Sequence, residues 1–123
     1  MAANCEKTVK DLFAAWTRLS VDEIMACFAE DAVLDNVPMA PAKGKAAIRE
    51  MTQGFLKDAN SFTAQIVRSV GDGNVVFNER IDMFDIGEKR IELPVAGVFE
   101  VRGGKITLWR DYFDLPSYTK QMS

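Results

Sequence analysis

The residues with the clearest chemical potential in this chain are two aspartates and an arginine in two separate strand-like segments. Arg80 and Asp82 occur in the segment "NERIDMF", and Asp111 occurs about thirty residues later in "KITLWRDYFD". Because alternate side chains of a strand share a face, Arg80 and Asp82 should point the same way. Ionised carboxylates are costly to bury unless they are paired. The presence of apolar residues next to these two aspartates in the sequence therefore needs an explanation.

Aromatic side chains flank these polar residues on the same strand faces. Phe84 follows Asp82 by two positions, while Trp109 and Phe113 lie two positions either side of Asp111. The spacing predicts that Phe84 borders the same site as the aspartates. For Trp109 and Phe113, the pattern fits the lining of a pocket and the packing of a core equally well.

Two aspartates and one arginine in one pocket would form an acid and base pair. Two carboxylates and one guanidinium leave an excess of negative charge, which together with poor solvation raises one apparent pKa. One carboxyl group then keeps its proton and donates it, while the other is ionised and accepts one. The same pattern also fits exposed ion pairs on the solvent side of a sheet, which contribute little to stability.

The composition restricts the chemistry that this chain can perform. Its 123 residues suit one domain over 1–123, and 48% hydrophobic with 27% charged residues is typical of a globular protein. There is no histidine, and Cys5 and Cys27 form no metal-binding motif, so we expect no metal and no cofactor. Catalysis must therefore depend on carboxylates, arginine, tyrosine, amides and water.

Charge and hydrophobicity also limit the partners and the location. The formal charge is −3 and no basic stripe occurs, so nucleic acid is not an expected partner. No apolar run is long enough to cross a membrane, and "MAANCEKTVK" lacks the apolar core of a signal peptide. We therefore expect a cytoplasmic protein with free thiols and no membrane association.

The order of elements predicts an α+β fold. Helical spacing occurs over 4–19 and 45–58, and Ser20 with Glu23 forms a capping-box signature before a short helix. A strand is predicted at 31–36, a loop at 37–44 and a final short helix from Pro116. Four more strands are separated by turns rich in Gly, Asp and Asn, at 61–70, 75–85, 90–101 and 105–114. A curved mixed or antiparallel sheet packed on three to four helices would enclose an apolar pocket.

The alternation of side chains gives two of these strands a clear inward face. For 61–70 the predicted inward residues are apolar: Phe62, Ala64, Ile66 and Val70. For 90–101 they are Ile91, Leu93, Val95, Phe99 and Val101, with Gly97 among them. The opposite faces are mostly polar, so the direction of the core is defined for both strands.

The chain resembles the limonene-1,2-epoxide hydrolase family of the SnoaL-like and NTF2-like superfamily. The resemblance rests on "RID" at 80–82, "GGKITLWRDYFDL" at 103–115 and "CFAEDAVLDNVPMAPAKGKAAI" at 27–48, and its order and spacing fit nearly the whole chain. It implies a cone-like α+β barrel with a deep pocket, a small hydrophobic ligand and often a homodimer. It also implies hydrolysis of an epoxide to a vicinal diol without a cofactor.

The resemblance assigns a role to each polar residue of the site. Asp111 would be the general base that deprotonates a water, and Asp82 the general acid that protonates the epoxide oxygen. Arg80 would bridge the two carboxylates, and Asn36 would position the water through its amide. Such a site performs the reaction without a covalent enzyme intermediate.

One residue departs from the family pattern. The family has a tyrosine two positions before the asparagine, where it also holds the water, whereas this chain has Leu34. Leu34 should still reach the site because it shares a strand face with Asn36. It indicates a slower hydrolase, a different chemistry or a more apolar pocket. The alternatives are therefore a polyketide cyclase-like or ketosteroid isomerase-like enzyme and a non-catalytic small-molecule-binding protein.

Overall fold

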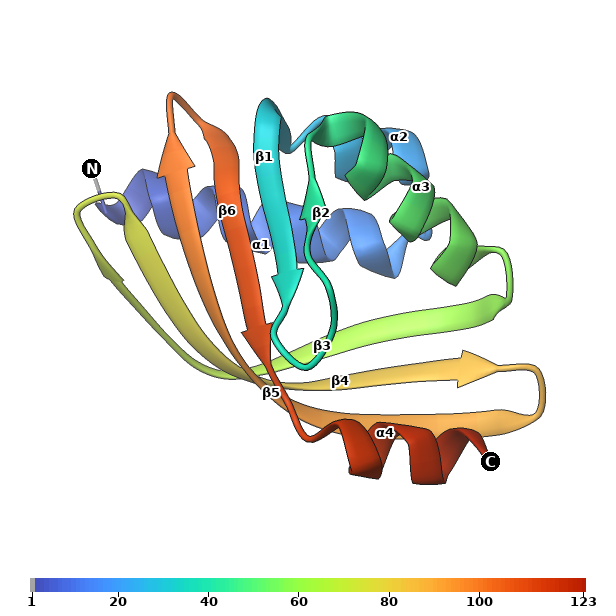
Figure 1. The fold of residues 1–123 in the computed structure, drawn as a ribbon. Helices are drawn as coiled ribbons and strands as arrows, with labels where there is room; N and C mark the ends of the chain where they lie inside the picture. The colour runs from blue at the N-terminus through green and yellow to red at the C-terminus, as the bar shows by residue number, and fades with distance from the viewer. Residues whose placement is uncertain (1) are drawn as a thin grey trace.

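The structure, a computed structural model, describes residues 2–123 as helices packed on one curved sheet (Figure 1). Met1, the first residue of the predicted domain, lies outside the described residues. The helices are α1 (Ala2–Thr17), α2 (Val21–Met25), α3 (Lys45–Leu56) and α4 (Leu115–Met122). The strands are β1 (Phe28–Asn36), β2 (Ala42–Lys43), β3 (Ala59–Asp72), β4 (Val75–Ile86), β5 (Lys89–Arg102) and β6 (Lys105–Tyr112).

The sheet has the strand order β2-β1-β6-β5-β4-β3. Strands β3 to β6 form an antiparallel meander, and β1 joins it parallel to β6. Gly73, Gly87 and Gly103 have positive φ in the three hairpin turns, a conformation that glycine adopts without strain. The predicted α+β class with a mixed, curved sheet is confirmed. The sheet remains open, with β2 and β3 as its two edge strands.

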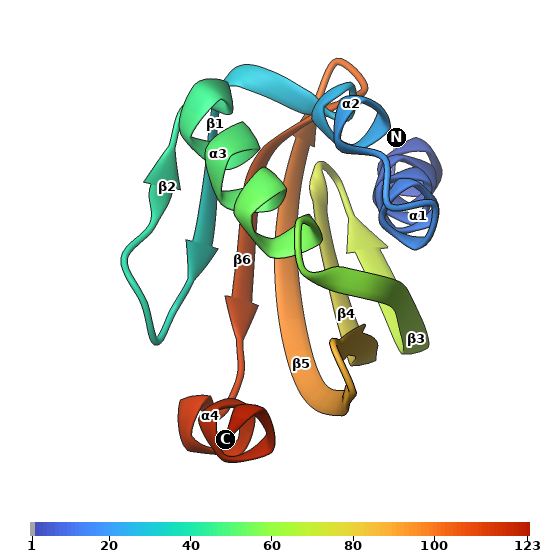
Figure 2. The same cartoon turned by 90° about the vertical axis from the view of Figure 1, so that its right-hand side faces the viewer.

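The helices α1 and α3 cover the concave face of the sheet, as Figure 2 shows. α1 contacts β3 to β6, whereas α3 contacts β1, β2 and β3. The core between these layers is apolar and includes several aromatic rings; its deeply buried members include Leu12, Ile24, Phe28, Ile48, Ile91, Phe99 and Ile106. Burial of these side chains supplies the main driving force for the fold.

Two local predictions are changed at the start of the sheet. The strand expected at 31–36 already begins at Phe28, and the expected loop at 37–44 contains β2, whose residues pair with Val33 and Leu34. The predicted cap is present, because the Ser20 hydroxyl accepts a hydrogen bond from the Glu23 amide at 3.2 Å. The extra pairing extends the sheet by one short edge strand beside β1.

The predicted inward position of Val70 is wrong. Phe62 and Ile66 face the core as expected, but the Val70 residue is 62% exposed. A bulge between Ile66 and Arg68 places two β3 residues opposite one β4 residue and reverses the alternation beyond it. Val70 therefore lies on the outer face of the sheet.

The helix α4 docks on a part of β5 that β6 leaves unpaired. β6 pairs with β5 only from Ala96 onward, so the edge near Glu92 is free of strand neighbours among the described residues. The Gln121 side chain occupies this edge, accepting from the Glu92 amide at 2.9 Å and donating to its carbonyl at 3.0 Å. Lys89 also donates to the Met122 carbonyl. These contacts imitate a strand pair and hold α4 at one end of the pocket.

Among residues 2–123, no helix is long and apolar enough to cross a membrane.

Candidate active site

A cavity of about 220 Å³ lies between the concave face of the sheet and the helices α1, α3 and α4. Most of its wall is apolar, which suits a small hydrophobic ligand. The lining residues are Trp16, Leu34, Asn36, Met39, Met51, Thr52, Phe55, Phe62, Asp82, Phe84, Leu93, Val95, Trp109, Asp111, Phe113 and Tyr118. The charged residues in this lining are Asp82 of β4 and Asp111 of β6.

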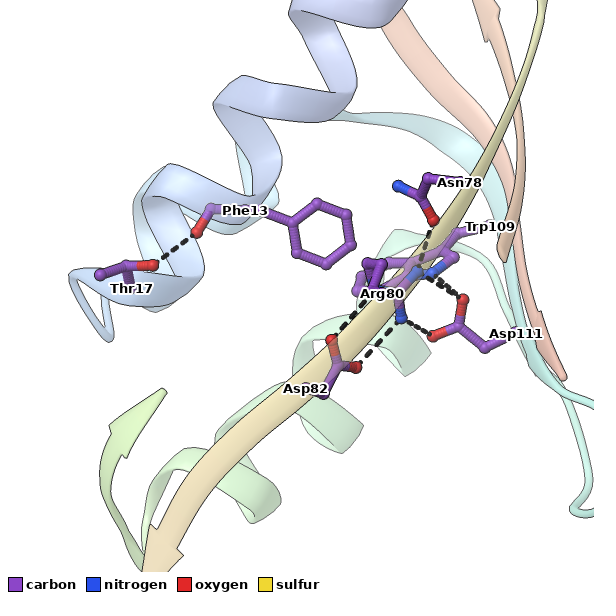
Figure 3. A network of polar contacts seen from close by, with 7 residues as sticks. All are labelled: Phe13, Thr17, Asn78, Arg80, Asp82, Trp109 and Asp111. Atoms are coloured by element: carbon purple, nitrogen blue, oxygen red, sulfur yellow. Dashed lines mark hydrogen bonds and ion pairs between the residues drawn. The ribbon is translucent and has the colours of Figure 1, made fainter. Parts of the chain in front are cut away.

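Arg80 lies fully buried beneath the two aspartates and uses all five of its N–H donors (Figure 3). Nε and Nη2 each donate to an Asp82 carboxylate oxygen at 3.0 Å. Nη2 also donates to Asp111 Oδ2 at 2.7 Å, and Nη1 donates to Asp111 Oδ1 at 3.2 Å. The fifth bond runs from Nη1 to Asn78 Oδ1 at 3.0 Å. The guanidinium is therefore saturated and fixed in one orientation.

The two carboxylates differ in their surroundings. Among the described residues, Asp82 is held only by Arg80, and its side chain is 12% exposed. Asp111 is bound by Arg80 and by Trp109, whose Nε1 donates to Asp111 Oδ1 at 2.7 Å, and its side chain is 7% exposed. More donors favour the ionised form of a carboxyl group. The hydrogen bonds thus favour the ionised form of Asp111, whereas its burial opposes ionisation.

Strand pairing aligns the polar residues in one row across the sheet. Asn36 of β1 is in register with Asp111 of β6, which is in register with Gly97 of β5, which in turn faces Asn78 of β4. A Cβ at Gly97 would lie 2.5 Å from Arg80 Nη1 and 2.8 Å from Asp111 Oδ1. The missing side chain at this position leaves the space through which the guanidinium reaches β6.

Burial and charge shift the pKa values of this cluster. Burial alone would lower the pKa of Arg80, but the Asp111 and Asp82 carboxylates outweigh it, so the net shift is upward and the cation is retained. Burial raises the pKa of Asp111, because it outweighs the opposing charge and hydrogen bonds of Arg80. A carboxylate with a raised pKa is a stronger base once it is ionised.

The structure brings together every residue that the sequence placed in the site. Asp82, Asp111 and Asn36 line the cavity, and Arg80 joins the two carboxylates from below. The predicted contact residues Leu34, Trp109, Phe84 and Phe113 also line the cavity. Arg110, the neighbour of Asp111 on β6, points to the opposite, outer face of the sheet, where its Nε pairs with Asp35 at 3.0 Å.

Several lining residues were not predicted as site residues. Leu93 and Val95 lie on the inward face that side-chain alternation predicts for 90–101, and this alternation is the signal by which they could have been predicted to line the cavity. Asn78 shares a face with Arg80 and Asp82 by the same alternation, but the sequence pattern gave it no role. Met39 and Tyr118 come from a loop and from α4, whose docking no local pattern predicts.

The remaining acidic and thiol side chains are too dispersed to form a metal site among the described residues. Within residues 2–123, no group of three or more Cys, Asp or Glu side chains lies close enough together to hold a metal ion. In the candidate site itself, the positive charge between the two carboxylates is supplied by Arg80.

An open curved sheet that encloses an apolar pocket with buried charges is the architecture of an NTF2-like pocket protein. A protein from Catenulispora acidiphila, described as having a ketosteroid isomerase-like fold, superposes with a TM-score of 0.83 over 93% of this chain and 90% of that chain. Its sequence identity is 23%, so this likeness shows the fold alone.

Two further comparisons identify the family. The family model of the limonene-1,2-epoxide hydrolase (LEH) catalytic domain matches residues 3–123. An LEH-like epoxide hydrolase of M. tuberculosis superposes with a TM-score of 0.88 and 32% identity, over 98% of this chain and 90% of that chain. The chain therefore belongs to the limonene-1,2-epoxide hydrolase family.

A curated relative supports the same family over a shorter stretch. Epoxide hydrolase EphG of Mycobacterium tuberculosis is 39% identical over 97 residues, which cover 76% of this chain. The matched stretch spans 62% of the length of EphG.

The close approach at Gly97 predicts that Gly97→Ala destabilises the protein. The added methyl group would push apart Arg80 and Asp111, whose ends cannot move without breaking the saturated network. We expect the free energy of unfolding, measured by urea titration, to fall by about 2 kcal/mol or more.

Gly54→Ala is the matched control for this experiment. Gly54 lies within α3, and a Cβ there would meet nothing within 4 Å. Alanine is the better helix former, so this variant should be stabilised by up to about 1 kcal/mol. Equal unfolding free energies for Gly97→Ala and the wild type would contradict the proposed crowding.

Proposed function

We propose that this protein hydrolyses a small hydrophobic epoxide to a vicinal diol by general acid and base catalysis, without a cofactor. The observation that carries the proposal is the pair of buried aspartates that share Arg80 and face an apolar cavity. Family membership supports the class of reaction, and the apolar wall supports a hydrophobic substrate.

The reaction needs one proton to be removed and one to be supplied. The Asp111 carboxylate takes a proton from water as the water oxygen bonds to an epoxide carbon. The carbon–oxygen bond of the ring breaks, and Asp82 gives its proton to the leaving oxygen. The pair ends with Asp111 protonated and Asp82 ionised, and transfer of this proton from Asp111 to Asp82 restores the resting state. Arg80 keeps the charge of the pair balanced throughout.

Asn36 is suited to hold the attacking water. It lines the cavity beside Asp111, its partner in the parallel β1–β6 register, so a water could contact both side chains. Leu34 lines the same wall and supplies no hydroxyl group. The lost hydrogen bond would slow the reaction by a factor of about ten or more.

A non-catalytic binding protein is the second candidate function, and Leu34 is the observation that favours it. The pocket would then bind an apolar ligand while the reaction is lost. The polyketide cyclase-like and ketosteroid isomerase-like alternatives would need a site that removes a proton from carbon and stabilises an enolate. Both Asp82 and Asp111 are instead bound to one arginine, an arrangement that suits proton exchange between them.

A homodimer through the outer face of the sheet is our proposal for the quaternary structure. Val70, Phe77 and Tyr112 are 62%, 53% and 48% exposed and line one shallow hollow on this face. Arg68 and Glu79 line the same hollow with opposite charges. A second copy related by a two-fold axis would cover the apolar residues and match the charges. The cytoplasmic location stays a prediction.

Substitution of either aspartate tests the proposed function. Asp111→Asn and Asp82→Asn should each reduce diol formation from a panel of hydrophobic epoxides by at least about 100-fold, since each removes one proton transfer. Asp85→Asn is the control, because Asp85 lies on β4 like Asp82 but contacts Ser61 and Arg90 and not Arg80.

In a single turnover with labelled water, the label should enter the diol and never the protein. Undiminished activity in either site variant would exclude the assigned roles, and tight ligand binding without turnover would favour the binding protein.

The pH dependence of the reaction follows from the shared proton. Below the pKa of Asp111 the base is protonated, so kcat/KM should rise with pH as Asp111 ionises. Because burial raises this pKa, the acid limb should lie above the ordinary aspartate value of about 3.9. A profile that stays flat above the ordinary aspartate range would contradict the pair.

Light scattering after size exclusion tests the homodimer. The wild type should have twice the 13.7 kDa mass of the chain, and Phe77→Asp should be monomeric because it places a charge in the apolar patch. Val37→Asp is the control, since Val37 is 43% exposed but does not line the hollow on the outer face of the sheet. A monomeric wild type, or equal dissociation by both variants, would exclude this interface.

A further inference from the structure

The fifth acceptor of the Arg80 guanidinium is the side chain of Asn78. Asn78 lies two residues before Arg80 on the inner face of β4 and is 5% exposed. Its Oδ1 accepts from Arg80 Nη1 at 3.0 Å, and the four other acceptor positions belong to the two aspartates. Asn78 is thus the neutral member of an otherwise anionic set of acceptors.

The orientation of the Asn78 amide is set by its bond to Arg80. A guanidinium only donates hydrogen bonds, so the amide oxygen must face Nη1. Its Nδ2 is then buried, and among the described residues it has no hydrogen-bond partner. An unsatisfied buried donor costs about 1–3 kcal/mol. Retention of an amide at this cost indicates a specific requirement for its oxygen.

We infer that Asn78 is a positioning residue, whose neutral oxygen fixes the Arg80 guanidinium so that it contacts both aspartates without a third negative charge. This inference goes beyond the proposed function and rests on it only in treating Asp82 and Asp111 as an acid and base pair. Figure 3 shows the arrangement, with Asn78 and Asp82 at different parts of the guanidinium and Asp111 on the neighbouring side.

Among the described residues, the charged side chain that Asn78 contacts is Arg80. Asp82 and Asp111 are the ion-pair partners of that guanidinium. β5 contributes Gly97, which has no side chain, and α1 contributes the Phe13 ring, 4.6 Å from the Arg80 guanidinium carbon. The cross-strand neighbour on β3 is Ser69, whose hydroxyl donates to Glu6 of α1 at 3.1 Å.

A carboxylate in place of the amide would change the charge of the whole cluster. Aspartate has the size of asparagine and would still accept from Arg80 Nη1. The third negative charge would, however, disfavour ionisation of Asp82 and Asp111. The base would then be protonated at a pH where the wild type has it ionised. The amide therefore supplies the geometry of an acceptor and leaves the pair able to share one proton.

Asn78→Asp and Asn78→Leu separate the charge of this residue from its hydrogen bond, and neither measurement needs a substrate. Site-assigned carboxyl carbon NMR follows the titration of Asp82 and Asp111, and nitrogen NMR follows rotation of the Arg80 guanidinium. Asn78→Asp should move the titration midpoint of the pair upward by about one pH unit while Arg80 stays locked. Asn78→Leu removes the acceptor and should speed the rotation of the guanidinium.

Asn74→Asp is the matched control, because it adds the same charge at the β3–β4 turn. An unchanged midpoint in Asn78→Asp, or the same change in Asn74→Asp, would overturn the inference. A guanidinium that stays locked in folded Asn78→Leu would also overturn it. If Asn78→Leu does not fold, the Asn78→Asp titration alone decides. Since no epoxide is used, failure of this inference is distinct from failure of the proposed hydrolysis.

Discussion

The buried guanidinium of Arg80 is the constraint on which the rest of the site depends. A cation that is fully buried is tolerated only when its charge and all of its donors are matched. Two carboxylates and one amide provide this match through five hydrogen bonds. The arginine in turn makes it possible to hold two carboxylates against an apolar cavity. Each half of the cluster would be unstable there without the other.

The sheet satisfies this constraint through its strand register. Asn36, Asp111, Gly97 and Asn78 occupy one row across four neighbouring strands, so backbone pairing alone sets their order. Gly97 leaves the space that the guanidinium needs at the centre of the row. The Phe13 ring of α1 covers the cation from the other side and excludes water. Secondary structure, packing and electrostatics therefore meet in one small region.

Alternation of side chains predicted much of this site, but not its assembly. It placed Arg80 with Asp82 on one strand face and Asp111 on a face of another strand, because these segments are regular. That they meet depends on β5 lying between their strands and carrying glycine at one position, which is a property of the tertiary structure. The same limit explains the error at Val70, where a bulge that no local pattern predicts reverses the alternation.

The position of Leu34 connects the fold with the proposed chemistry. Leu34 is in register with Trp109, one row away from the polar row, so polar groups on this part of the wall are concentrated beside Asp111. A hydrocarbon wall weakens solvation of the nearby carboxylate, which acts in the same direction as the burial that raises the pKa of Asp111. Under the proposed mechanism, Leu34 would replace one hydrogen bond to the water by a hydrocarbon wall of the cavity. This exchange would make Asp111 and Asn36 the groups on which activation of the water depends.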